Sequence, residues 1–162
     1  GQLDLSLEPK NAREIARLGA VITDAANEQL GFSHPEIPDW KHISFCQFTW
    51  PIVSSGGRQI GPNAVSIKPA KLDRSPCGTG TSARMAVLHA KGEMNVSDTL
   101  VATSIVGSEF EGQIMSETKV GDRQGIIPKI TGRAWITGTH QLTLDPTDPW
   151  PGGYRLSDTW PS

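Results

Sequence analysis

The chain has 162 residues and a formal net charge of −2, with 17 acidic and 15 basic residues interspersed along it. This length suffices for one domain with a hydrophobic core, and the charge pattern gives no basic surface for nucleic acid or an anionic membrane. No apolar run approaches the roughly 20 residues that a transmembrane helix needs. We therefore expect one domain whose partners are neither nucleic acids nor membranes.

The first predicted element is a helix that runs from Asn11 to about Leu30. Apolar residues recur there at helical spacing, and Gly31 supplies a usual stop. We expect this helix to cover a sheet with one apolar stripe, formed by Ile15, Leu18, Ile22, Ala25 and Ala26.

Two strands are predicted next, over residues 43–49 and 63–67, with a glycine-containing break at 54–57 between them. In the first strand the residues alternate as the two faces of a strand do, with Ile43, Phe45 and Gln47 against Ser44, Cys46 and Phe48. The second strand leads into the segment that contains Asp73 and Cys77.

A second helix is expected after Pro76, because a first turn of small residues is followed by Ala83, Ala86, Val87, Leu88 and Ala90 at helical spacing until Gly92. Further strands are predicted over 99–106, 113–117, 125–130 and 133–144. In the last of these we expect His140 to be a strand-face residue rather than a base. Mostly β structure would then wrap one apolar helix, which predicts an α+β fold with an irregular, surface-exposed tail.

The cysteines are few, and only Cys46 and Cys77 are present. Two cysteines do not make the disulfide framework of a small secreted domain, and a reduced, cytoplasmic setting fits them better. A disulfide between them stays open, but it would remove the free thiol of Cys77. The histidines show no metal-ligand spacing with each other or with the cysteines. We expect neither a metal nor an organic cofactor.

Cys77 is the first candidate for chemistry, because it lies at or just before the start of the second helix. The free N–H groups and positive dipole end of a first helical turn favour an anion. That anion is either a substrate carboxylate on the Gly78 and Thr79 amides or the Cys77 thiolate itself. A purely structural reading stays open, in which Cys77 is a small buried hydrophobe and Asp73 an ordinary turn or capping residue.

The exact string adds to this reading. Residues 73–86 are Asp-Arg-Ser-Pro-Cys-Gly-Thr-Gly-Thr-Ser-Ala-Arg-Met-Ala, which closely resembles the second active-site motif of the proline racemase and hydroxyproline epimerase family. Further similarity lies at 63–65 (Asn-Ala-Val), 105–110 (Ile-Val-Gly-Ser-Glu-Phe), 130–134 (Ile-Thr-Gly-Arg-Ala) and 145–149 (Asp-Pro-Thr-Asp-Pro). The resemblance extends from about Leu7 onward and is strongest after Asn63.

The resemblance implies a fold and an activity. The fold would be the diaminopimelate-epimerase-like (proline racemase) fold, in which each of two pseudo-symmetric halves wraps a β-barrel-like sheet around a central helix. The activity would be cofactor-independent inversion of the α-carbon of proline or a hydroxyproline by two cysteines. On matching positions, Cys77 would be one acid/base cysteine, Asp73 would accept the ring-nitrogen hydrogens, and the Gly78 and Thr79 amides would hold the carboxylate.

One departure from the family pattern concerns the second cysteine. In the family it belongs to an earlier Cys-Gly-His motif, which this sequence does not contain, and Cys46 lacks the accompanying glycine and histidine. Residues 1–162 therefore resemble the C-terminal domain of a two-domain enzyme whose N-terminal half is absent from this chain. We expect the chain alone to be unable to racemise a substrate.

The other departure concerns the substrate pocket. Phe45 occupies the position that resembles the histidine of hydroxyproline epimerases or the cysteine of proline racemases, and Ile67 stands where an aromatic residue often precedes the motif. An apolar lining would weaken recognition of a ring hydroxyl. The presence of Cys77 argues against the similar 3-hydroxyproline dehydratases, which carry threonine there.

The preferred interpretation is a 4-hydroxyproline epimerase, with proline racemase as the nearest alternative. A non-catalytic domain that binds a carboxylate or has only a structural role is the alternative from another class. Acyl transfer by Cys77 would need a positioned histidine base, and nothing near the motif supplies one. The expected partners are proline or hydroxyproline, the N-terminal segment of the same enzyme and, as an open option, a second copy in a homodimer.

Overall fold

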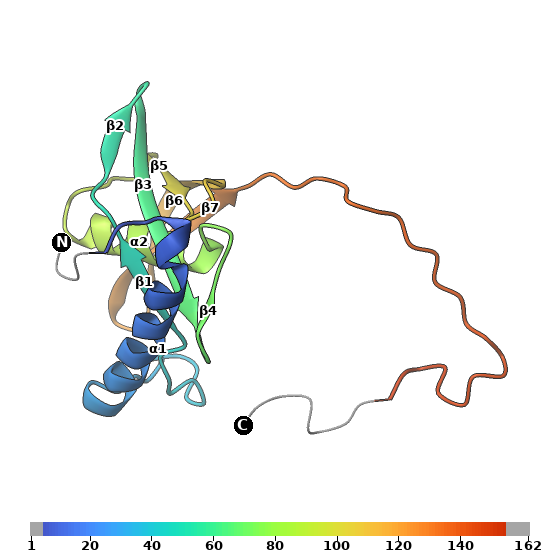
Figure 1. Cartoon of the computed structure of the whole chain (residues 1–162). Coiled ribbons are helices and arrows are strands. Elements are labelled where there is room, and N and C mark those ends of the chain that lie inside the picture. Colours follow the sequence, from blue (N-terminus) through green and yellow to red (C-terminus); the bar gives the residue numbers. More distant parts are fainter. Residues whose placement is uncertain (1–4, 155–162) are drawn as a thin grey trace.

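The computed structural model describes residues 5–154, which form two helices of more than one turn and one sheet (Figure 1). In chain order the elements are the 3-10 turn η1 (Pro9–Asn11), α1 (Ala12–Gln29), β1 (Phe45–Thr49), β2 (Val53–Ser55), β3 (Arg58–Ile67), β4 (Lys71–Leu72), α2 (Gly78–Ala90), β5 (Thr99–Thr103), β6 (Glu109–Val120) and β7 (Arg123–Thr131).

The seven strands make one mixed sheet in the order β1-β3-β5-β6-β7, with β2 and β4 also paired to β3. Only the pairing of β3 with β5 is parallel, and the other described pairings are antiparallel. A parallel pair needs a crossover connection, and α2 lies within that crossover. The first turn of α2 packs against the last residues of β3, where Gly80 lies on Val65.

Strand β3 separates the two helices. Ser66 faces α1, where its Oγ donates a hydrogen bond of 2.8 Å to the Ala16 carbonyl oxygen. Val65, one residue earlier, faces α2, because its Cγ2 lies near Gly80. The alternation of a strand therefore gives each helix its own set of β3 side chains.

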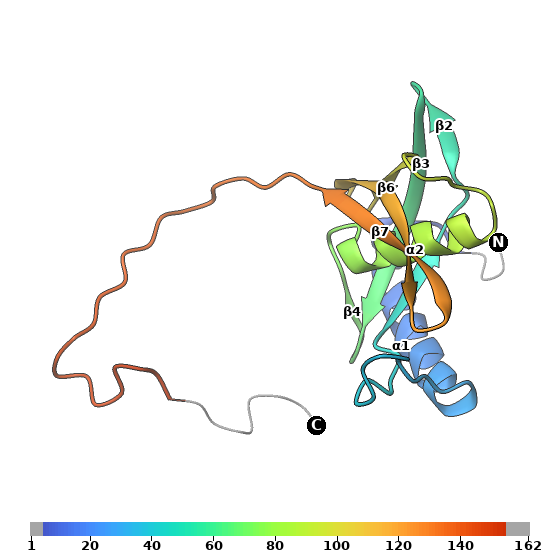
Figure 2. The ribbon, with the colours of Figure 1, turned by 180° about the vertical axis from the view of Figure 1, so that it is seen from behind.

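The sheet curves around α2, as Figure 2 shows from behind. The buried core on this side joins α2 to β5 and β6 and consists of Met85, Leu88, Met94, Leu100 and Ile114, with Ile126 and Ile130 of β7 packed against it. A second cluster lies under α1 and is built around Ile15, Ala64 and Ile105. This α+β arrangement of a curved sheet around a helix confirms the predicted fold class.

The first helix agrees with its predicted range to within one residue at each end, but its buried face is rotated. The residues that α1 buries are Ile15, Ala16, Gly19 and Thr23, whereas Ile22 of the predicted stripe is exposed. The reason is that Gly19 lets α1 approach Ser66 of β3 very closely. The point of closest approach, rather than the largest apolar side chains, fixes the orientation of the helix.

The predicted strand over 133–144 is wrong. After β7, residues 132–144 have no strand pairing and run away from the sheet (Figure 1). His140 is exposed and is therefore not a residue on a sheet face. The alternation in this segment is typical of a strand, but a strand needs a neighbour for its backbone N–H and C=O groups, and the described chain offers none there.

The segment after β7 exposes large apolar side chains. Ile136 and Leu142 are each 93% exposed. Trp135, Leu144, Trp150 and Tyr154 are also exposed. Within residues 5–154, neither helix is long and apolar enough to cross a membrane.

Candidate active site

Cys77 is the N-cap residue of α2, which confirms the predicted position of its sulfur at a helix start. Its Sγ accepts a hydrogen bond from the Gly80 N–H at 3.3 Å. The residue has φ 64° and ψ 115°, a left-handed conformation that a side chain makes unfavourable. This backbone turns the sulfur back over the first turn of α2, where it caps the Gly80 N–H.

A chain of hydrogen bonds holds Cys77 in this conformation. Asp73 Oδ1 accepts from the Ser75 N–H at 3.0 Å and from the Ser75 hydroxyl at 3.1 Å. Ser75 Oγ in turn accepts from the Cys77 N–H at 3.1 Å. On the helix side, the Thr81 hydroxyl donates to the Cys77 carbonyl oxygen at 2.8 Å. Asp73 therefore stabilises the turn before α2 through its Oδ1.

The amides of Gly78 and Thr79 make no hydrogen bond to any residue between 5 and 154. They are two of the orphan donors that every helix start leaves. A Cβ built on Gly78 would meet nothing within 4 Å, so the backbone there is open to a ligand. An anion could approach these two amides without displacing a side chain.

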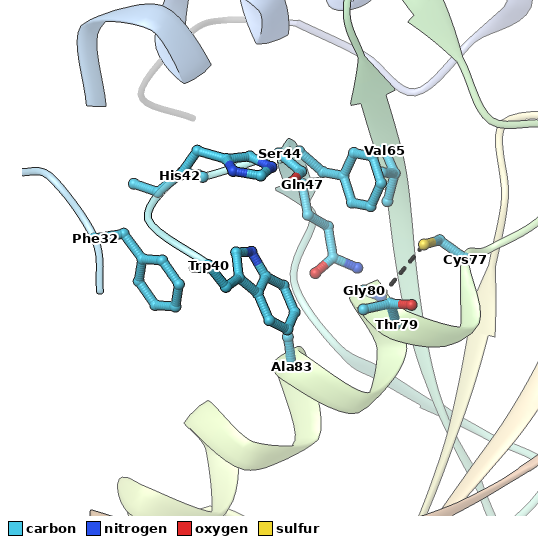
Figure 3. Close-up of a pocket in the computed structure, with 12 residues that line it drawn as sticks. Phe32, Trp40, His42, Ser44, Gln47, Val65, Cys77, Thr79, Gly80 and Ala83 are labelled. Atoms are coloured by element: carbon cyan, nitrogen blue, oxygen red, sulfur yellow. Dashed lines mark hydrogen bonds between the residues drawn. The ribbon is translucent and has the colours of Figure 1, made fainter. Parts of the chain in front are cut away.

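A pocket of about 270 Å³ opens beside the sulfur (Figure 3). Its wall comes from the loop before β1, from β1 and β3, and from the first turns of α2. The lining residues are Phe32, Trp40, His42, Ile43, Ser44, Phe45, Gln47, Val65, Cys77, Thr79, Gly80 and Ala83. Most of these side chains are apolar, so the pocket suits a small ligand with an apolar ring.

The structure brings some of the predicted site residues to this pocket and leaves others outside it. Cys77, Thr79 and Phe45 line it. Gly78 and Asp73 are not in its wall, although both are joined to Cys77 through the turn. Ile67, the last residue of β3, also lies outside, although its partner across the sheet is Phe45.

Several pocket residues were not predicted. Phe32 and Trp40 come from the loop that follows α1, and the sequence of that loop has no periodic pattern that points to a site. Gln47 was detectable, because it shares the Phe45 face of β1 by simple alternation. Its position two residues after Phe45 was the available signal.

The loop over residues 31–44 is fastened to the far end of the sheet. Its Glu36 carboxylate accepts a 2.6 Å hydrogen bond from the Gly121 N–H, in the turn between β6 and β7. Within the loop, the His34 ring stacks on Trp40, with ring centroids 5.3 Å apart and planes 3° from parallel. The contact with Gly121 therefore helps to position the loop side chains that line the pocket.

We expect Glu36→Ala to loosen this loop. A net hydrogen-bond contribution of about 1 kcal/mol corresponds to roughly fivefold faster amide exchange of Gly121 and of the loop, measured by hydrogen–deuterium exchange. Glu36→Gln keeps an acceptor oxygen and should change the exchange rates less. Glu28→Ala, which removes an exposed charge from α1, is the matched control. Equal exchange in Glu36→Ala and wild type would contradict the proposed fastening.

Cys46 does not share the site. Both cysteines are free thiols, but Cys46 alternates with Phe45 and Gln47 on β1 and so points to the other face of the sheet. Burial raises the pKa of the Cys46 thiol, which disfavours its thiolate. Within the described residues no cluster of histidine, cysteine, aspartate and glutamate side chains could hold a metal ion.

Comparisons with known proteins identify relatives of this fold. A family model described as Proline racemase matches residues 1–155. A solved hydroxyproline epimerase from Agrobacterium vitis with bound trans-4-OH-L-proline is 36% identical with a TM-score of 0.77, over 98% of this chain and 45% of that chain. A probable proline racemase from Agrobacterium radiobacter K84 with bound carbonate is 38% identical with a TM-score of 0.78, over 99% of this chain and 46% of that chain. The chain thus spans slightly less than half the length of these two structures.

Proposed function

The chain belongs to the proline racemase family, and on this premise we propose that it supplies one acid/base cysteine to a cofactor-independent epimerase that inverts the α-carbon of 4-hydroxyproline. The observation that carries this proposal is the position of Cys77. Its sulfur caps the first turn of α2, 3.3 Å from the Gly80 nitrogen, and lines a pocket of small-molecule size.

The proposed reaction begins with the Cys77 thiolate. The thiolate takes the α-proton from one face of the substrate. The C–H bond breaks and an S–H bond forms, while the electron pair of the C–H bond stays on the α-carbon and its carboxylate. A thiol on the opposite face then donates a proton to the α-carbon, which inverts its configuration. The reverse direction exchanges the roles of the two thiols.

The developing negative charge needs stabilisation. The unpaired Gly78 and Thr79 amides are suited to hold the substrate carboxylate, which gains charge as the proton leaves. Asp73 Oδ1 is used by Ser75, and Oδ2 is the atom we assign to the hydrogens of the ring nitrogen. The pocket wall is mostly apolar, and its closure by the other domain would exclude water and strengthen these contacts.

The second thiol is proposed to come from another part of the enzyme. We propose that residues 1–162 are the C-terminal domain of a two-domain protein, because the chain covers 45% and 46% of the two similar solved chains. The exposed apolar residues after β7, such as Ile136 and Leu142, support this, since a large exposed apolar surface usually marks an interface. The other domain would cover them and complete the site.

Proline racemase is the second candidate function. The apolar side chain of Phe45 in the pocket favours it, because a ring hydroxyl without a polar partner costs free energy on burial. The two similar structures do not separate the candidates, since one is described as a hydroxyproline epimerase and the other as a probable proline racemase at nearly equal identity.

The test compares the complete enzyme with the isolated 162-residue chain. Both are incubated in D₂O with each epimer of 4-hydroxyproline and each enantiomer of proline, and α-proton exchange is followed by NMR. We expect inversion and exchange with the complete enzyme, fastest on 4-hydroxyproline, and none with the chain alone. Exchange catalysed by the chain alone would refute the two-domain site, and no turnover by the complete enzyme would refute the proposed function.

A further inference from the structure

Gln47 lies in the middle of β1, opposite Val65 of β3, and lines the pocket beside Cys77. Its amide nitrogen Nε2 is buried and has no hydrogen-bond partner in the described chain. Asn63 also has unpartnered buried side-chain atoms, but it does not line the pocket. Gln47 therefore brings a buried and unsatisfied donor to the wall of the candidate active site.

The position of this amide is set by close packing against α2. A Cβ built on Gly80 would lie 3.0 Å from Gln47 Nε2 and 3.1 Å from Val65 Cγ2. The carboxamide thus rests on the same helical turn whose Gly80 N–H donates to the Cys77 sulfur. Figure 3 shows the Gln47 side chain extending from β1 toward this turn, between Trp40 and Cys77.

The surroundings of Gln47 make an unpaired amide costly. The pocket wall includes the apolar Phe45, Val65 and Ala83, and its polar side chains, such as Ser44 and Thr79, make no hydrogen bond with Nε2. A buried donor without a partner costs about 1–3 kcal/mol, and an apolar side chain of similar shape would avoid that cost. Because Nε2 is covered where it lies, a ligand pairs with it once the carboxamide has turned from Gly80 into the pocket, and that pairing removes the penalty.

We propose that the Gln47 carboxamide recognises the ring hydroxyl of the substrate and so determines the preference for 4-hydroxyproline over proline. This inference rests on the proposed epimerase function. A carboxamide can donate and accept, and a hydroxyl can do both, whereas the ring methylene of proline can do neither. A site with a buried group that pairs with a substrate hydroxyl disfavours the analogue without it, because the group is then left unpaired. Gln47 thereby offsets the apolar character of Phe45.

The test is Gln47→Met in the complete enzyme, since methionine keeps the length of the side chain and removes the carboxamide. We expect kcat/KM for 4-hydroxyproline to fall about 10- to 100-fold, with less than about threefold change for proline. The affinity ratio of the two ligands, measured by calorimetry, should shift in the same direction. Gln59→Met is the matched control, because Gln59 is exposed on β3 and its amide pairs with Ser54. That control should leave unchanged both the ratio of the two kcat/KM values and the ratio of the two affinities.

Equal losses on both substrates, or no loss on either, would overturn the role of Gln47. A wild-type enzyme that turns over neither substrate would instead overturn the proposed function, while the calorimetric ratio would still test Gln47. If thermal unfolding shows that Gln47→Met is not folded, Gln47→Glu replaces it. The glutamate keeps acceptor oxygens and lacks the N–H donors, so we expect a smaller shift of the same ratio, and an unchanged ratio contradicts the inference.

Discussion

Replacing Cys77 with serine in the complete enzyme is expected to lower kcat for 4-hydroxyproline at least about 100-fold, and up to about 10⁴-fold, the range that a positioned acid/base group contributes. A serine hydroxyl at the helix start cannot supply the corresponding base at neutral pH, because the alkoxide is far less accessible than a thiolate. Serine is also a favourable N-cap residue. The fold and the first turn of α2 should therefore survive the change.

The measurement is the initial rate of inversion by optical rotation, with exchange of the α-proton in D₂O as a second reading. Cys46→Ser is the matched control, because Cys46 lies on the opposite face of β1 and burial raises the pKa of its thiol. We expect that control to keep kcat within about twofold. Unchanged turnover by Cys77→Ser would show that the sulfur is not an acid/base group. The first turn of α2 would then only bind the substrate carboxylate.

The position of Cys77 at a helix start could be predicted from sequence because it depends on local features. Pro76, the small first turn and the apolar periodicity up to Gly92 together set the boundary of α2 within about two residues. The hydrogen bonds that Asp73 accepts from Ser75 and that Ser75 accepts from Cys77 span only two residues each. Contacts between residues so close in the chain can be predicted from the local sequence.

The rest of the pocket depends on contacts that are distant in sequence. Trp40 reaches the site because its loop is held by Glu36 on Gly121, a contact across 85 residues, and no local pattern encodes such a pairing. The strand predicted over residues 133–144 is wrong for a related reason. Its alternation predicts a strand, but pairing into a sheet depends on a neighbour that the alternation does not specify.

The closest approach between α1 and the sheet gives the second large prediction, in which Gly19→Ala destabilises the protein. A Cβ at position 19 would overlap Ser66 Cβ, would lie 2.5 Å from Ser66 Oγ and 3.2 Å from the Phe48 ring. Backbone or ring atoms must therefore shift, at a cost of about 1–3 kcal/mol. The shift also strains the hydrogen bond from Ser66 Oγ to Ala16, which contributes about 1 kcal/mol more.

Helix propensity works in the other direction, since alanine favours a helix by about 1 kcal/mol relative to glycine. A net loss of about 2 kcal/mol remains, which corresponds to a decrease of about 4–8 °C in Tm for a domain of this size. Gly78→Ala is the matched control, because it adds the same methyl group to a helix where nothing lies within 4 Å. We expect Gly78→Ala to leave Tm unchanged or slightly higher but to weaken substrate binding at the open amides.

The two variants therefore separate packing from binding. Thermal unfolding of the complete enzyme should place Gly19→Ala well below wild type and Gly78→Ala at or above it, and KM should rise mainly in Gly78→Ala. A stabilised Gly19→Ala would mean that helix propensity outweighs the clash with Ser66, and α1 would then sit farther from β3 than the close packing at Gly19 requires.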